Sequence, residues 1–281
     1  MFGSAVLEVA VGLIVCCGSI ALIASSLQEA VASMLRWRAS TLLQGIQDLL
    51  NRQLPLVLGI YNHALVNPRD NGAARSIDEL SSRVTPSYIK PMDFAQALVD
   101  KLRAGSVDPV AIRQTIADIG DQQLRDCLLG LFDRASGDVS RFESAVAQWF
   151  DGAMDRVSGA YKRKAQLWTF IFGLLIAIAF NIDAHQVMTT LWHAALVGHG
   201  LPAWSEPKDV AQALGNINEL PVGWGRLWAL KEGKPDIFYE AMAWALPGWI
   251  ITATATLFGA PFWFSLLEKL DGIRGTGGKP S

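Results

Sequence analysis

The chain has 281 residues, of which 51% are hydrophobic and only 18% are charged, and its formal net charge is −2. Soluble globular proteins carry about 25% charged residues, so this composition argues against an ordinary soluble domain. The net charge also argues against a nucleic-acid-binding protein that needs a basic surface, and we expect no nucleic-acid partner. The three cysteines, Cys16, Cys17 and Cys127, cannot build a disulfide framework, and we interpret them as reduced, small apolar residues.

Three stretches of the chain are long and apolar enough to cross a membrane. They cover 3–27, 165–182 and 241–267, and Glu8 in the first stretch is the one charged residue that they contain. A bilayer core needs about 20 apolar residues of helix, so three such stretches predict three transmembrane helices. A buried helix of a soluble protein is the alternative for one stretch, but it accounts poorly for three. The first stretch lacks a basic n-region, and we expect it to be retained as an anchor rather than cleaved.

The distribution of basic residues predicts the orientation of these helices. Residues 28–164 contain 17 lysines and arginines, whereas residues 183–240 contain only four. Basic residues close to the membrane mark its cytoplasmic side. We therefore expect a protein of the bacterial inner membrane with a periplasmic N-terminus, a cytoplasmic segment 28–164, a periplasmic loop 183–240 and a cytoplasmic tail 268–281.

Two groups of helix breakers interrupt the third apolar stretch. Pro247-Gly248 and Gly259-Ala260-Pro261 each predict a bend in an otherwise continuous helix. The glycine-rich tail 268–281 is interpreted as flexible. The outer loop contains four tryptophans, which predict that it rests on the membrane, and its segment 187–200 is the candidate for the interface. These tryptophans are Trp192, Trp204, Trp224 and Trp228.

The segment 28–164 has the pattern of a small helical bundle. Apolar residues recur at helical spacing from the first apolar stretch as far as Pro55, so we expect one helix to leave the membrane and become amphipathic. Breakers follow at 67–72, and no stretch resembles a strand. Further helices are predicted from Asp93, as the N-cap, to Gly105, from Pro109 to Gly120, over 124–135 and over 139–163.

The segment WFDGAMDRVSGAYKRK, residues 149–164, joins this bundle to the second apolar stretch. On a helix, its apolar residues form one stripe, and its aspartates form a second stripe beside it. Two glycines lie on another side, where a neighbouring backbone has room to approach. We interpret this helix as packed on its apolar and glycine faces, with its acidic stripe towards water or a partner. The candidate packing or docking residues are Asp151, Gly152, Asp155, Arg156 and Gly159, and Lys162, Arg163 and Lys164 are expected to form a basic collar at the lipid headgroups.

A catalytic carboxylate pair is the alternative interpretation of Asp151 and Asp155. Residues four apart share one face of a helix, so the two side chains have the right spacing. An acid/base site also needs a pocket and further polar side chains, and the sequence identifies none beside them. No GxSxG, HExxH or CxxC motif is present either. We therefore expect no catalytic residues and no cofactor.

Ionisable and hydroxyl residues near the first apolar stretch are candidates for an ion pathway. Glu8 lies near its outer end, and an ionisable residue inside a span is a functional candidate. Small hydroxyl residues in a span mark helix–helix contacts more often than a pore, so packing is the alternative for this whole set. The set comprises Glu8, Ser19, Ser25, Ser26 and Glu29. His185, His193 and His199 share the outer loop without the spacing of a zinc site, and we expect no metal.

Five segments along the chain form distinctive motifs. They are WFDGAMDRVSGAYKR at 149–163, EVAVGLIV in the first apolar stretch, PSYIKPMDFAQALVD at 86–100, NIDAHQV at 181–187 and GAPFWFSLLEKL at 259–270. In these motifs the chain resembles a family of bacterial inner-membrane proteins that has no assigned function. It departs from the family pattern at Ala160, where a second aromatic residue is expected, and at Ser265, where an acid is expected. The resemblance covers most of the chain and implies a membrane location but no particular chemistry.

Together these patterns predict an all-α, multi-pass membrane protein with three transmembrane helices and a cytoplasmic helical bundle. We expect a non-enzymatic, oligomeric scaffold or anchor whose cytoplasmic helices dock a partner. Its partners would be the lipid bilayer and either further copies of itself or a second protein. A small ion channel or proton-coupled device that uses Glu8 is the alternative, and a membrane enzyme that uses Asp151 and Asp155 is the third hypothesis.

Overall fold

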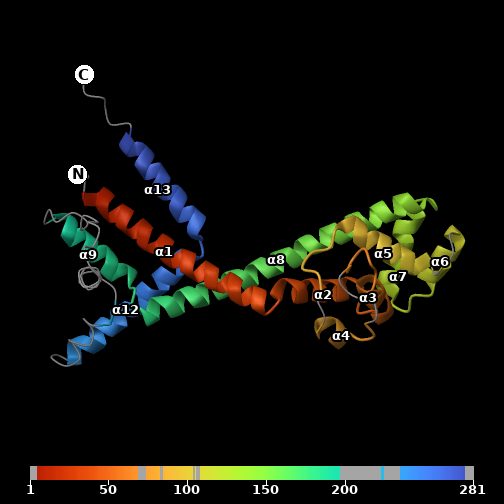
Figure 1. Cartoon of the computed structure of the whole chain (residues 1–281), viewed down its shortest axis with the longest axis horizontal. Coiled ribbons are helices and arrows are strands. Elements are labelled where there is room, and N and C mark those ends of the chain that lie inside the picture. The colour runs from red at the N-terminus through yellow and green to blue at the C-terminus, as the bar shows by residue number, and fades with distance from the viewer. Residues whose placement is uncertain are drawn as a thin grey trace, which may run out of the picture. The chain divides into compact units, whose positions relative to one another are not determined.

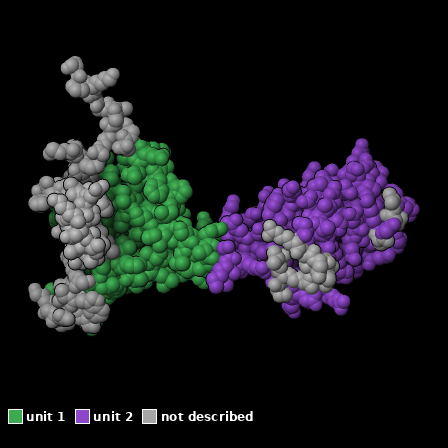
Figure 2. Space-filling model, viewed as in Figure 1, with its two compact units in different colours: residues 1–31, 165–281 green, residues 32–164 purple. Residues whose placement is uncertain are grey.

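The computed structural model describes residues 5–68, 74–82, 85–103, 105, 108–196, 223–224 and 235–275. Within these ranges it contains helices and no strand, which confirms the all-helical prediction (Figure 1). The chain divides into two compact units (Figure 2). We call Ala32–Lys164 the bundle unit, and we call Met1–Val31 together with Ala165–Ser281 the apolar unit.

The bundle unit is built around one hydrophobic core. Its largest fully buried side chains include Phe94, Phe142 and Phe150. The rings of Phe94 and Phe150 stack with centroids 4.0 Å apart, and Phe132 meets Phe142 edge-on at 5.2 Å. This core confirms the predicted helical bundle. Its helices are α2 (Trp37–Leu49), α3 (Leu54–Tyr61), α4 (Ile77–Ser82), α5 (Pro91–Arg103), α6 (Pro109–Ala117), α7 (Gln122–Arg134) and the first part of α8 (Val139–Ala179).

Aspartates begin two of these helices. The carboxylate of Asp108 accepts the backbone N–H of Val110 at 3.0 Å at the start of α6, and that of Asp121 accepts the N–H of Leu124 at 2.7 Å at the start of α7. The Leu124 N–H holds the pKa of Asp121 below its ordinary value. The predicted N-cap role of Asp93 was wrong. Helix α5 begins earlier, at Pro91, because proline is pre-organised for the first helical position, and Asp93 lies in the first turn.

The helix that was predicted to run from the first apolar stretch to Pro55 is broken. Helix α1 (Ala5–Met34) ends before Leu35, and α2 begins at Trp37. Arg36 at the break has a φ of 53°, a left-handed conformation that costs roughly 1–2 kcal/mol outside glycine. No proline or glycine marks this position, so the prediction failed for lack of a local signal. Beyond the break, Trp37 and Ile46 of α2 are buried.

The apolar unit contains α1, the last part of α8, α9 (Ala184–Leu196), α12 (Pro235–Thr256) and α13 (Ala260–Gly275). By length and composition, one described helix, Val9–Met34, is long and apolar enough to cross a membrane by itself. Two bent pairs of helices raise that number to three if each pair is one span. These pairs are Val139–Ala179 with Ala184–His193, bent by 56°, and Ile237–Thr256 with Ala260–Leu270, bent by 88°.

The breakers of the third apolar stretch have different effects. Gly259, with a φ of 75°, separates α12 from α13, which confirms the bend predicted there. Pro247 lies inside α12, and the helix continues through it. Helix α13 extends to Gly275, so residues 268–275 are helical and do not belong to a flexible tail. Residues 276–281 lie outside the described part of the chain.

Candidate functional site

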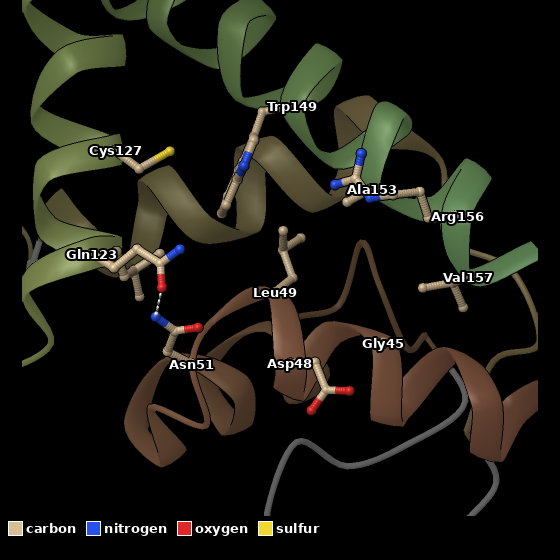
Figure 3. A pocket seen from close by; sticks show the side chains of 11 residues that line it. Gly45, Asp48, Leu49, Asn51, Gln123, Cys127, Trp149, Ala153, Arg156 and Val157 are labelled. Atoms are coloured by element: carbon tan, nitrogen blue, oxygen red, sulfur yellow. Dashed lines mark hydrogen bonds between the residues drawn. The ribbon is translucent and has the colours of Figure 1, made fainter. Parts of the chain in front are cut away.

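Two hollows flank helix α8 in the bundle unit. The first, which we call the α2–α7–α8 cavity, has a volume of about 360 Å³. Polar side chains of Asp48, Asn51, Gln123 and Arg156 lie at it beside an apolar lining (Figure 3). The apolar lining consists of Gly45, Leu49, Leu124, Cys127, Trp149, Ala153 and Val157.

Hydrogen bonds join the elements that surround the α2–α7–α8 cavity. The side-chain amide of Asn51 donates to Asp121 Oδ1 at 2.8 Å and to Gln123 Oε1 at 3.3 Å, which ties the end of α2 to the start of α7. Trp149 and Leu49 point towards one another across the cavity (Figure 3). Burial raises the pKa of the Cys127 thiol, so this cysteine lines the cavity as a small apolar group.

The second hollow, which we call the α2–α8 groove, has a volume of about 490 Å³. It lies on another face of α8 and also involves the chain that leads into α5. Its lining combines an apolar base with groups of both charges. The lining residues are Arg38, Thr41, Leu42, Ser87, Tyr88, Ile89, Pro91, Phe150, Asp151, Met154, Asp155, Val157, Ser158, Tyr161 and Lys162.

Asp151 and Asp155 therefore lie beside a hollow with polar neighbours that the sequence alone did not identify. Arg38 Nε donates to the Tyr161 hydroxyl at 3.2 Å, and the guanidinium carbon lies 5.6 Å from the centre of the Tyr161 ring. Tyr88 is 69% exposed at the same groove. Arg38 and Tyr88 are far from the aspartates in sequence, so only the tertiary fold brings them together.

The glycine face of α8 is not packed as predicted. A Cβ added at Gly152 would meet no described atom within 4 Å, and one added at Gly159 would meet only an Arg163 nitrogen at 3.7 Å. The close approach between α2 and α8 occurs at a glycine of α2 instead. A Cβ added at Gly45 of α2 would lie 2.5 Å from the Val157 side chain of α8. The small residue that permits helix contact is therefore on α2.

The predicted basic collar is exposed at the end of the bundle unit. The side chains of Lys162, Arg163 and Lys164 are all exposed. Lys164 Nζ lies 5.0 Å from the centre of the Trp37 ring, so one collar residue makes a cation–π contact with α2.

Two hydroxyl groups of α1 donate hydrogen bonds within their own helix. Ser19 and Ser25 donate to the carbonyl oxygens of Val15 and Ala21 at 2.8 Å and 2.6 Å. Ser26 and Glu29 are exposed, and Glu8 lies in α1 with its side chain outside the described part of the structure.

Metal-binding side chains do not gather in the described ranges. His185 and His193 lie on α9, whereas His199 is outside these ranges, as are Trp204 and Trp228. Within these described ranges there is no group of three or more histidine, cysteine or acidic side chains that could hold a metal ion.

A buried polar junction lies in the apolar unit, at the end of α8. Asn181 is 1% exposed and adopts a left-handed conformation, with a φ of 46°. The N–H of Ile182 reaches back to the carbonyl of Ala177 at 2.7 Å, so asparagine ends the helix where glycine is usual. The Asn181 side chain accepts from Trp249 Nε1 at 3.1 Å and donates to the Gly223 carbonyl at 2.9 Å.

Asp183 completes this junction, which we call the Asn181–Asp183 junction. Its carboxylate, only 6% exposed, accepts the His185 N–H at 2.9 Å and so caps α9. The same carboxylate is so close to Gly248 of α12 that an added Cβ would overlap it. Thr252 on the next turn of α12 donates to the Ile182 carbonyl at 2.9 Å. The polar groups of the Asn181–Asp183 junction thus bond to one another, which is the arrangement that a site away from water requires.

Comparisons with protein-family models, with curated proteins and with solved structures each found no match. The family resemblance drawn from the sequence therefore stays a prediction. The motif NIDAHQV contains both Asn181 and Asp183, but no role was predicted for either residue. A signal was present, because asparagine just after an apolar helix and aspartate just before another match the preferences of helix ends.

Proposed function

We propose that this protein is a three-span protein of the bacterial inner membrane that anchors a cytoplasmic helical bundle and docks a partner protein on it. The observation that carries the proposal is helix α8. It runs unbroken from Val139 to Ala179, and it contributes Phe142 and Phe150 to the bundle core and then an apolar stretch from Ala165. A helix that is part of a folded domain and continues into apolar residues is suited to fix that domain at a membrane.

The membrane part of the proposal rests on apolar surface. Large side chains of α1, α12 and α13 are exposed, among them Leu22, Ile23, Ile250 and Phe264, whose exposed fractions are 49–55%. A soluble monomer rarely exposes large contiguous apolar patches. A bilayer solvates such side chains without cost, and each bent helix pair would then count as one span. The distribution of basic residues supports a cytoplasmic location for 28–164.

The α2–α7–α8 cavity is the proposed docking place for a segment of a soluble protein. Its apolar base of Leu49 and Trp149 and its polar edge of Asp48, Gln123 and Arg156 have the composition of a protein interface, in which tryptophan and arginine are enriched. The role is non-enzymatic. Further copies of this chain are the alternative occupant. Ser19 and Ser25 give no support to the ion-pathway alternative, because their hydroxyl groups donate to carbonyl oxygens of their own helix.

Site-specific photo-crosslinking in living cells tests the docking. A photoreactive amino acid in place of Gln123, which is exposed at the cavity, is expected to capture one defined protein. The same amino acid in place of Ser140, which is exposed but lines neither hollow, is the matched control and should capture none. Truncation of the interface anchor in Trp149→Ala should reduce the adduct by about 30-fold, since such anchors contribute about 2 kcal/mol or more.

The identity of the cross-linked protein distinguishes a separate partner protein from a second copy of this chain. Capture of a second copy of this chain would indicate a homo-oligomeric scaffold instead of a complex with a partner protein. Equal labelling at Gln123 and Ser140, or no adduct at Gln123, would contradict docking at the cavity.

A further inference from the structure

We propose that the segment that docks at the α2–α7–α8 cavity is an amphipathic helix with an aspartate or glutamate on its apolar face, and that Arg156 binds this carboxylate. The inference rests on the proposed function, because it names the chemistry of the partner that docks there. Its own observations are the surface of α8 around Arg156 and the contacts of the Arg156 side chain.

One stripe of α8 leads from the cavity onto the surface of the bundle unit. Four residues follow one another along it at spacings of three, four and three, so they share one face of the helix. They are Trp149, Gly152, Arg156 and Gly159. A Cβ added at the exposed Gly152 would meet no described atom within 4 Å, so another backbone has room to approach there. Because alternating spacings of three and four form the seam between two packed helices, the stripe suits a helical occupant.

The Arg156 side chain is exposed and has no hydrogen bond, ion pair or ring contact with any residue that the structure describes. Its neighbours on the helix surface are the residues three and four positions away, and these are all glycine or alanine. They are Gly152, Ala153, Gly159 and Ala160. These positions therefore provide no acidic partner for the guanidinium.

The acidic residue on the opposite side of the cavity does not pair with Arg156 either. The carboxylate of Asp48 lies 3.8 Å from the guanidinium of Arg52, and the Asp48 side chain points away from Arg156 (Figure 3). Arg156 is thus the charged group of the cavity that an acidic group from outside can bind. On α8 it follows Trp149 by seven residues, or roughly 10 Å of helix rise, so a docked helix can contact both.

The surroundings of Arg156 favour a carboxylate over a phosphate. Phosphorylated segments are recognised by clusters of arginines, whereas the described lining of the cavity contains one arginine and no lysine. One guanidinium matches one carboxylate through two parallel hydrogen bonds. Asp48 at the same cavity also repels a phosphate, with its charge of about −2, more strongly than a carboxylate.

Photo-crosslinking from position Gln123 in living cells tests the role of Arg156. Arg156→Gln is expected to reduce the adduct about tenfold, because hydrogen bonds between charged groups are lost. Arg156→Lys keeps the charge without the paired donors and should reduce the adduct less. Arg141→Gln is the matched control, because Arg141 is an exposed arginine of α8 that lines neither hollow, and it should keep the adduct.

A charge reversal identifies the carboxylate. Mass spectrometry of the adduct identifies the cross-linked segment of the partner, in which each aspartate or glutamate is then replaced by lysine. One of these replacements is expected to reduce the adduct of the unmodified chain about tenfold and to restore the adduct of Arg156→Glu. A direct contact predicts this restoration, whereas a merely misfolded Arg156→Glu variant would not recover.

Gly152→Met tests the approach of a second helix. The methionine side chain would fill the space beside Arg156 and is expected to reduce the adduct about tenfold. The thermal unfolding midpoint of the full chain in mild detergent should not fall, because no described atom lies within 4 Å of the added Cβ. An unchanged adduct in this variant would overturn the helical occupant.

The remaining outcomes separate this inference from the proposed function. An adduct that is reduced by Trp149→Ala but unchanged in Arg156→Gln would overturn the carboxylate contact and leave docking at the cavity intact. Failure of every lysine replacement to restore the adduct of Arg156→Glu would overturn the contact as well. No adduct at Gln123 in the unmodified chain would overturn both proposals, and capture of a second copy of this chain would overturn the assignment to a partner protein.

Discussion

Replacement of Gly248 by alanine is expected to destabilise the apolar unit strongly. The added Cβ would overlap the carboxylate of Asp183, which is buried and caps α9. Overpacking of a filled site costs about 1–3 kcal/mol. Displacement of the Asp183 carboxylate would also remove the cap, which is worth about 1 kcal/mol. The measurement is the thermal unfolding midpoint of the full chain in mild detergent, together with the yield of monodisperse protein.

A mutant cycle separates this contact from a general defect. In the background Asp183→Ala the overlapping carboxylate is absent, so Gly248→Ala should cost much less there than in the unmodified chain. Gly152→Ala is the matched control, because an added Cβ meets no described atom within 4 Å at that helical position. It should be neutral or stabilising by up to about 1 kcal/mol. Equal costs of Gly248→Ala in both backgrounds would show that the Asp183 contact is not the cause.

Replacement of Tyr61 by phenylalanine is expected to stabilise the bundle unit. Tyr61 is 0% exposed, and its hydroxyl has no hydrogen-bond partner among the described residues. A buried polar group without a partner costs about 1–3 kcal/mol, so its removal should raise the free energy of unfolding by about 1 kcal/mol. Tyr88→Phe is the control, because Tyr88 is 69% exposed and its hydroxyl meets water.

The effect of Tyr61→Phe should grow in alkaline solution. Burial raises the pKa of Tyr61 above its ordinary value of 10.0. Above pH 10 the unfolded chain ionises at this residue while the folded chain still holds the proton. The unfolded state then binds fewer protons, so stability is lost as pH rises, by about 1.4 kcal/mol per pH unit at most. The difference between the two proteins, measured by denaturant unfolding at pH 7 and pH 11, should therefore widen at pH 11. A destabilised Tyr61→Phe variant would show that the hydroxyl has a partner.

Local patterns were sufficient to predict the helical class and much of the bundle. Phe150 belongs to the apolar stripe that was predicted on the segment 149–164, and it is fully buried in the core. Gly259 was predicted to bend the third apolar stretch, and it separates α12 from α13. These features depend on periodicity and on backbone preferences, which neighbouring residues determine.

Features that depend on contacts between residues far apart in the sequence were not predicted. The break at Arg36 has no proline or glycine to mark it. The hollow beside Asp155 was missed because Arg38 and Tyr88 reach it from other helices and connections. The hydrogen bond between Asn181 and Trp249 joins residues 68 positions apart, and no local pattern encodes which indole meets which amide.

Cysteine accessibility in intact bacterial cells tests the central claim, a membrane-anchored bundle on the cytoplasmic side, most directly. The native Cys16, Cys17 and Cys127 are first replaced by alanine, and a single cysteine is then introduced as Ser140→Cys in the bundle or as Ser205→Cys in the loop 183–240. A maleimide that does not cross the inner membrane should label Ser205→Cys in intact cells and Ser140→Cys only after the membrane is opened. Labelling of Ser140→Cys in intact cells, or recovery of the protein in the soluble fraction, would contradict this account.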